Sequence, residues 1–174
     1  MTTRTATRST PRPTVAGDAI KLLTDDHKQV KGLFQKYSKL IETDADAHAD
    51  ERQPLAEQTC VMLTVHAAIE EEIFYPAARE AEVDSDLLDE AEVKHASAKD
   101  LIAQIRAMSP EDDLCDAKVT VLGEYIDHHV KEEQDELFPR CVKSLMDPKA
   151  IDTELATRKQ ELMKEMSEGM ASTQ

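Results

Sequence analysis

The segment HAAIEEEIFYP, His66 to Pro76, returns 63 residues later as HVKEEQDELFP, His129 to Pro139. In both copies the histidine is followed four residues later by a glutamate and ten residues later by a proline. An apolar or aromatic pair occupies the eighth and ninth positions after each histidine. The chain therefore contains one structural unit that is built twice.

Each copy places its histidine and its glutamate on one face of a helix. A helical residue advances by about 100°, so Glu70 lies about 40° from His66, on the face that also carries apolar side chains. The same projection groups His129 and Glu133 with apolar residues of their own helix. His128 lies among charged residues instead, and Glu132 lies at the edge of the apolar face. We therefore predict that the pair His129 and Glu133 faces the core, in preference to the pair His128 and Glu132.

A further histidine precedes each copy of the repeat. An apolar residue stands seven positions before His27 and before His95, and apolar pairs stand six and seven positions after them. A lysine follows each of these histidines by four residues, and the second of these lysines is Lys99. Each half of the chain thus consists of a histidine in an apolar pattern, a linker, and the sequence His-x-x-x-Glu.

The composition favours an all-α fold. The 174 residues include only four Gly, three Phe, three Tyr and no Trp, whereas Ala, Leu, Glu and Lys are abundant. Apolar periodicity and capping residues, Asp18 first among them, predict helices over the ranges that follow, with short connections between them. These ranges are about 19–42, 55–79, 86–108 and 110–145. Short connections make consecutive helices antiparallel, which predicts an up-down-up-down four-helix bundle.

The chain divides into three parts. Residues 1–17 are rich in Thr, Arg and Pro and have little to bury, so we expect them to be disordered. We expect residues 18–146 to form the bundle domain. The tail, 147–174, has a weak apolar pattern that predicts a possible fifth helix, which either packs on the bundle, the preferred alternative, or binds a partner. Pro76 and Pro139 should each kink or end a helix of the bundle.

Charge and composition narrow the possible partners and location. The formal net charge is −15, which disfavours binding to nucleic acid or to an anionic membrane. We find no apolar run long enough to cross a bilayer and no apolar core of a signal peptide. The cysteines are three in number and lack metal-binding spacing, which fits a reducing compartment. We expect a cytoplasmic protein, and the sequence identifies no protein partner.

Four histidines and two glutamates that face one core require a common explanation, because a buried charged group needs a partner. Imidazole and carboxylate ligands without thiolate suit iron, manganese or zinc. Two carboxylates that can bridge favour two metal ions about 3.5–4 Å apart. The ferritin-like pattern Glu-x-x-His occurs once, at Glu92 to His95, but Leu63 and Ile126 replace the glutamate in front of the other two histidines.

Four motifs in order resemble the hemerythrin-like family with the HHE cation-binding domain, in its H-HxxxE-H-HxxxE form. They are LLTDDHKQVKGLF around His27, HAAIEEEIFYP from His66, EVKHASAKDLI around His95 and HVKEEQDELFP from His129. The resemblance covers about residues 18–140. It implies a four-helix bundle with two non-haem iron ions joined by an oxo or hydroxo bridge. In such a centre the terminal ligands would be His27, His66, His95 and His129, and Glu70 and Glu133 would bridge the irons.

The chain departs from the oxygen-carrying hemerythrins at two points. There the histidine of the third helix is followed four residues later by another histidine, and the last motif is HxxxxD. Here Lys99 and an HxxxE motif stand in their place, as in the bacterial hemerythrin-like branch. Tyr125, one turn before His129, is expected either to bind iron or donate a hydrogen bond at the site, or to be a core tyrosine. Glu136 is either a carboxylate beside the site or an exposed residue.

An open coordination position on a redox metal permits reaction with dioxygen, hydrogen peroxide or nitric oxide. We therefore favour a di-iron protein that reacts with such small molecules, including catalase-like decomposition of peroxide in oxidative or nitrosative stress defence. The alternative is a protein that binds or senses iron or oxygen without turnover. A metal-free helical interaction module is the third hypothesis.

Overall fold

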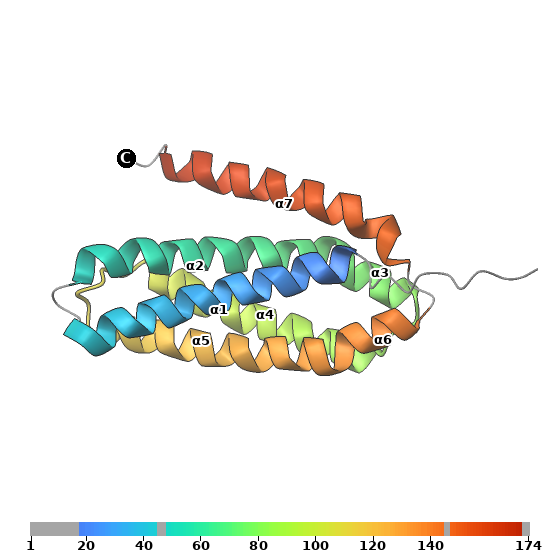
Figure 1. The fold of residues 1–174 in the computed structure, drawn as a ribbon, viewed down its shortest axis with the longest axis horizontal. Helices are drawn as coiled ribbons and strands as arrows, with labels where there is room; N and C mark the ends of the chain where they lie inside the picture. Colours follow the sequence, from blue (N-terminus) through green and yellow to red (C-terminus); the bar gives the residue numbers. More distant parts are fainter. Residues whose placement is uncertain (1–17, 45–47, 145–146, 172–174) are drawn as a thin grey trace, which may run out of the picture.

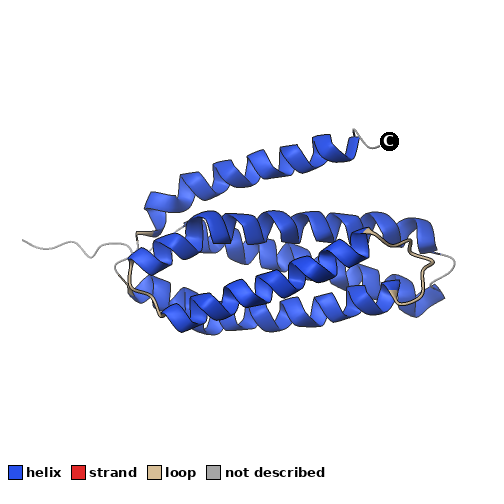
Figure 2. Ribbon diagram, turned by 180° about the vertical axis from the view of Figure 1, so that it is seen from behind, coloured by secondary structure: helices blue, strands red, loops and turns tan. Residues whose placement is uncertain are grey.

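The structure is a computed structural model that describes residues 18–44, 48–144 and 147–171. The segment 1–17, which we expected to be disordered, lies outside the described residues. Every regular element within the described ranges is helical, as predicted (Figure 2). The elements are α1 (Asp18–Asp44), α2 (Ala49–Ile69), η2 (Glu70–Phe74), α3 (Tyr75–Glu80), α4 (Ser85–Arg106), α5 (Cys115–Glu132), η3 (Glu133–Leu137), α6 (Phe138–Lys143) and α7 (Pro148–Ala171).

Four long rods form the bundle. The second rod consists of α2, η2 and α3 in sequence, and the fourth consists of α5, η3 and α6 (Figure 1). The first rod, α1, packs against α2 and α5, and α4 packs against the same two helices from the other side. Consecutive rods run in opposite directions, which confirms the predicted up-down-up-down bundle.

The fifth helix, α7, packs on the outside of α1 and α2 (Figure 1). Leu155 is fully buried in this contact, and Ile151 and Leu162 are partly buried against the same apolar cluster. The weak apolar pattern of the tail therefore corresponds to a helix that packs on the bundle.

Two helices begin at positions other than those predicted. The second rod begins at Ala49, so Pro54 lies inside α2 and not before it. Pro54 is the sixth residue of α2, beyond the first four positions whose N–H groups have no partner within the helix. Its missing N–H leaves the carbonyl of Asp50 without the usual helical bond, and Asp50 is exposed to water. The fourth rod begins at Cys115 and not at Ser109. Ser109 accepts and donates hydrogen bonds with Asp112, which closes a local turn that ends before the helix.

The core consists of two apolar clusters separated by a polar layer. One cluster includes Leu23, Ile69 and Leu88, and the other includes Val30, Leu63 and Ile102. On each of the four rods, a histidine lies between residues of the first cluster and residues of the second. The four histidines therefore lie in the layer between the two apolar clusters.

Both rods that contain the repeated segment have a π-helical turn directly after the histidine helix. The N–H of Tyr75 donates to the carbonyl of Glu70, five residues earlier, and the N–H of Phe138 donates to the carbonyl of Glu133 in the same way. Short π-helical turns inside α-helices occur often at functional sites. Neither proline ends its rod, because a short helix continues past it as α3 or α6, and the irregular turn lies directly before that helix.

None of the helices that the structure describes combines the length and the apolar character needed to cross a bilayer. The thiols of Cys60, Cys115 and Cys141 are free and buried.

Candidate metal centre

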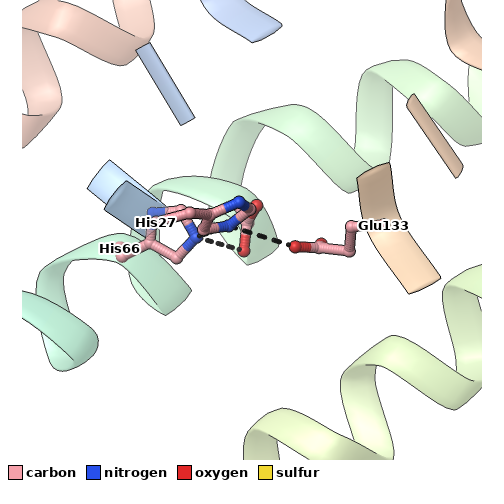
Figure 3. A group of neighbouring side chains, drawn as sticks. His27, His66 and Glu133 are labelled. Atoms are coloured by element: carbon pink, nitrogen blue, oxygen red, sulfur yellow. Dashed lines mark hydrogen bonds and ion pairs between the residues drawn. The ribbon is translucent and has the colours of Figure 1, made fainter. Parts of the chain in front are cut away.

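The structure brings all six predicted ligands together in the middle of the bundle. The histidines come from four different helices, and the glutamates are the first residues of the two π-helical turns. Each of the six is 6% exposed or less. Figure 3 shows His27 and His66 side by side, with the carboxylate of Glu133 pointing toward them. The six residues are His27, His66, Glu70, His95, His129 and Glu133.

The imidazoles form two pairs. The Nε2 atoms of His27 and His66 are 2.9 Å apart, and those of His95 and His129 are also 2.9 Å apart. Each pair consists of the histidine of one repeated segment and the histidine that precedes that segment in the sequence. Four ring nitrogens therefore point into one small region from the four walls of the bundle.

Each carboxylate connects the two histidine pairs. Glu70 Oε2 lies 3.3 Å from His66 Nε2 and 3.4 Å from His95 Nε2. Glu133 Oε2 lies 3.3 Å from His27 Nε2, and its Oε1 lies 3.7 Å from His129 Nε2. These distances define two groups of ligand atoms, each close enough together to hold a cation, and Glu70 belongs to both groups. One group is His27, His66, Glu70 and Glu133, and the other is Glu70, His95 and His129.

The donor atoms fit a bound cation. Glu70 Oε1 and Glu133 Oε2 are buried and accept no hydrogen bond from any described residue, although Glu133 Oε2 lies within ion-pair distance of His27. A buried carboxylate oxygen without a partner is costly, so a native structure normally satisfies it. Two such oxygens next to four imidazole nitrogens form an N/O donor set without thiolate, which suits iron, manganese or zinc.

Carboxylates on the outer side hold two of the imidazoles in place. His95 Nδ1 donates to Glu71 Oε1 at 3.0 Å, and His66 Nδ1 lies 3.4 Å from Asp26 Oδ2. A histidine that donates through Nδ1 presents the Nε2 lone pair to the centre, which is the usual arrangement around a metal. On the third imidazole, His27 Nδ1 lies 3.3 Å from the side-chain amide of Gln134.

The charges of the cluster set its proton affinity in the metal-free protein. Burial disfavours the imidazolium of His66, but Glu70 and Asp26 outweigh burial and raise the pKa of His66 to about 10. Burial opposes the charge on His95 as well, and Glu70 and Glu71 raise its pKa to about 9. Burial and the nearby His95 lower the pKa of His129. Since a metal ligand must be deprotonated, metal binding at neutral pH must release protons from this cluster.

Sequence reasoning missed Tyr75. Its side chain is fully buried, and its hydroxyl lies 2.9 Å from Glu133 Oε1 and 3.3 Å from His95 Nε2. In an uninterrupted α-helix a residue nine positions after His66 would point about 180° away from it. The extra residue of the π-helical turn rotates Tyr75 back by about 100°, which directs it inward. The repeat contained a signal for Tyr75: Phe138 stands at the equivalent position of the second copy, so both copies have an aromatic residue there.

The structure does not bring Tyr125 into the cluster. Tyr125 is partly buried and packs against the apolar cluster of Val30 and Ile102. It forms no hydrogen bond with any of the six residues within the described chain. Glu136 is exposed and lies 3.6 Å from Arg140. His128 is also on the surface, as predicted, and contacts Glu132 at 3.2 Å.

A small cavity of about 20 Å³ adjoins the four histidines. Its remaining walls are almost entirely apolar, and Lys99 is the one other charged residue on it; the apolar lining is Val30, Leu63, Ala67, Ala98, Ile102, Ile126 and Val130. A space of this size holds about one water-sized molecule. A larger cavity, of about 680 Å³, lies between α7 and the far end of the bundle, and none of the six residues lines it.

Comparisons with known proteins identify the fold and the family. A crystal structure of a hemerythrin HHE cation-binding domain-containing protein from Mycobacterium kansasii matches the fold with a TM-score of 0.69 and 21% sequence identity. The match covers 84% of this chain and 88% of that one. No curated protein sequence matches significantly. The sequence model of the hemerythrin HHE cation-binding domain matches residues 18–141, which is most of the chain, and the chain therefore belongs to the hemerythrin HHE family.

Proposed function

We propose that the protein is a non-haem di-iron protein that reacts with small oxidants or gases, namely dioxygen, hydrogen peroxide or nitric oxide. The observation that carries this proposal is the pair of shared carboxylates. Glu70 and Glu133 each contact a histidine of both pairs, and these contacts support a role for both carboxylates as bridges between two cations. A structural zinc site usually closes around a single ion with four ligands, and this cluster offers more.

The proposed ligand set follows from the same distances. One iron would be held by His27 and His66 and the other by His95 and His129, with both glutamates shared between them. The iron pair would supply the redox equivalents for the reaction. The protein would supply the fixed imidazoles, the carboxylate bridges and the exclusion of bulk water.

The small apolar cavity supports a diatomic or similarly small reactant. This cavity, the one that adjoins all four histidines, has a volume of about 20 Å³, which matches a reactant of that size. The Tyr75 hydroxyl lies beside the His95 and His129 pair and donates to Glu133. Burial, together with Glu70 and Glu133, raises the pKa of Tyr75 well above its usual value, so the phenol keeps its proton while the cluster carries negative charge. Tyr75 is therefore placed to orient Glu133 or to donate a hydrogen bond at the site.

Metal analysis combined with peroxide assays tests the proposal. We expect about two irons per chain, an absorption spectrum that changes when hydrogen peroxide is added, and release of one dioxygen for every two peroxide molecules consumed. His129→Ala should abolish this release, whereas His128→Ala should retain it. A spectral change without dioxygen release would favour binding or sensing without turnover. A chain that folds equally well in chelator and takes up no iron would contradict the proposal.

A further inference from the structure

Two adjacent basic residues of α7 contact acids that adjoin the candidate ligands. Arg158 Nε donates to Glu72 at 2.7 Å, and Glu72 stands two residues after Glu70. Lys159 donates to Asp26, the residue directly before His27. Both contacts come from a helix that lies outside residues 18–141, the range that matches the HHE domain.

The Lys159 contact is the deeper of the two. Asp26 is only 4% exposed, whereas the side chain of Glu72 is 45% exposed. Lys159 contacts Oδ1 of Asp26, and Oδ2 of the same carboxylate lies 3.4 Å from His66 Nδ1. A chain of polar contacts therefore runs from α7 through Asp26 to the imidazole of His66.

A second chain of the same kind serves the other histidine pair. Lys99 Nζ lies 2.7 Å from Glu71 Oε1, and the same oxygen accepts from His95 Nδ1 at 3.0 Å. In that case the lysine belongs to α4, inside the HHE domain. The two imidazoles are thus supported alike, except that the cation for His66 is provided by the C-terminal helix.

Burial explains why Asp26 needs this partner. A buried carboxylate without a partner is costly, and Lys159 satisfies one of its two oxygens. The other oxygen, Oδ2, faces His66 Nδ1 and can accept a hydrogen bond from it. This hydrogen bond holds the tautomer and ring orientation in which Nε2 faces the candidate metal position.

We propose that Lys159 is a positioning residue of the metal centre and that α7 supplies, through Asp26, the charge that orients His66 as a ligand. The proposal rests on the metal-binding function proposed above. It gives the C-terminal helix a part in metal retention in addition to packing.

The test measures metal release from the full chain loaded with Co(II) under anaerobic conditions and challenged with a chelator. We expect Lys159→Met and Asp26→Asn to release one of two cobalt equivalents about tenfold faster than the wild type, the lower end of the range for outer partners of a ligating histidine. The visible spectrum of the cobalt should also shift. Lys159→Arg should keep the slow release of the wild type. The double variant that combines Lys159→Met with Asp26→Asn should release cobalt at the rate of Asp26→Asn alone.

Arg158→Met is the matched control, because it removes the neighbouring α7 ion pair and leaves Asp26 untouched. Release from Lys159→Met within twofold of the wild type would overturn the proposal. Equal acceleration in Arg158→Met and Lys159→Met would also overturn it, because loosened docking of α7 would then be the cause. A wild-type chain that retains cobalt while Lys159→Met is unchanged contradicts this proposal alone. A wild-type chain that takes up neither cobalt nor iron contradicts the proposed function as well.

Discussion

The hydroxyl of Tyr75 donates a 2.9 Å hydrogen bond to Glu133, so the first copy of the repeated segment contacts the glutamate of the second copy. The equivalent residue of the second copy is Phe138, whose ring stacks on His27 at 5.9 Å between centroids. Tyr75 lies against His95 in the corresponding way, at 5.5 Å. The two halves are therefore alike in shape, but the first copy places a phenol hydroxyl among the ligands where the second places a phenyl ring.

Tyr75→Phe should fold, because Phe138 already occupies the matching position. We expect the substitution to lower the free energy of unfolding of the metal-free protein by about 1–3 kcal/mol, since Glu133 loses a buried hydrogen-bond donor. Urea denaturation in the presence of chelator measures this difference. Tyr125→Phe is the control and should change stability by less than about 0.5 kcal/mol, because Tyr125 is partly buried against apolar residues and contacts none of the six candidate ligands through a hydrogen bond within the described chain. Equal effects of the two substitutions would contradict the assigned role of Tyr75.

The adjacent residues His128 and His129 should respond oppositely to substitution. We expect His129→Ala to weaken iron binding by more than about tenfold, because even outer partners of a ligand contribute that much. His128→Ala should leave metal content unchanged, since the His128 side chain is 66% exposed. Metal analysis after dialysis against a weak chelator measures both variants. Loss of iron in His128→Ala would mean that the helix presents a different face to the centre in solution.

The metal-free protein should lose stability as pH rises from about 6.5 to about 10. The folded-state pKa values of His66 and His95, about 10 and about 9, lie above the unfolded value of 6.5. A raised pKa contributes stability that is complete below the unfolded pKa and lost as pH rises through the folded pKa. The pKa of Glu70 is held well below its usual range by His66 and His95, against the effect of burial, so stability should also fall on acidification below about pH 4.5.

Thermal unfolding in chelator, measured at a series of pH values, checks this profile. His66→Asn should flatten the alkaline decline, because it removes one of the two histidines with a raised pKa. The metal-loaded protein should decline less between pH 6.5 and 10, since its ligands are already deprotonated. A melting temperature of the metal-free wild type that stays constant over this interval would contradict the assigned charge pairing.

Two helical glycines should differ in their tolerance of alanine. A Cβ added at Gly32 meets nothing within 4 Å, so Gly32→Ala should stabilise the protein by about 0.5–1 kcal/mol through the backbone entropy of the unfolded chain. A Cβ at Gly123 would lie 3.1 Å from Cδ1 of Phe34, so Gly123→Ala should gain less or lose stability. At this chain length, 1 kcal/mol corresponds to about 2–4 °C in melting temperature. A larger gain at Gly123 than at Gly32 would contradict the close packing of Phe34.

The sequence by itself determined the architecture and the six members of the cluster. Helical periodicity is a local property, and the repeat places His66 and Glu70, like His129 and Glu133, on one face whatever their partners are. It also separated His129 from His128, because the two residues differ by about 100° around the helix. The convergence of the two halves followed from the antiparallel order that short connections impose.

The tertiary structure alone decided the remaining features. The π-helical turns change the direction of every later side chain in their rods, and this is why Tyr75 faces the centre although the periodicity of an unbroken helix directs it away. The start of α5 at Cys115 depended on a turn closed by Ser109 and Asp112, which competes with helix formation. The contact between Lys159 and Asp26 joins residues 133 positions apart. Local patterns specify a face of a helix, but a buried charge is satisfied by whichever group the packing of distant helices brings within reach.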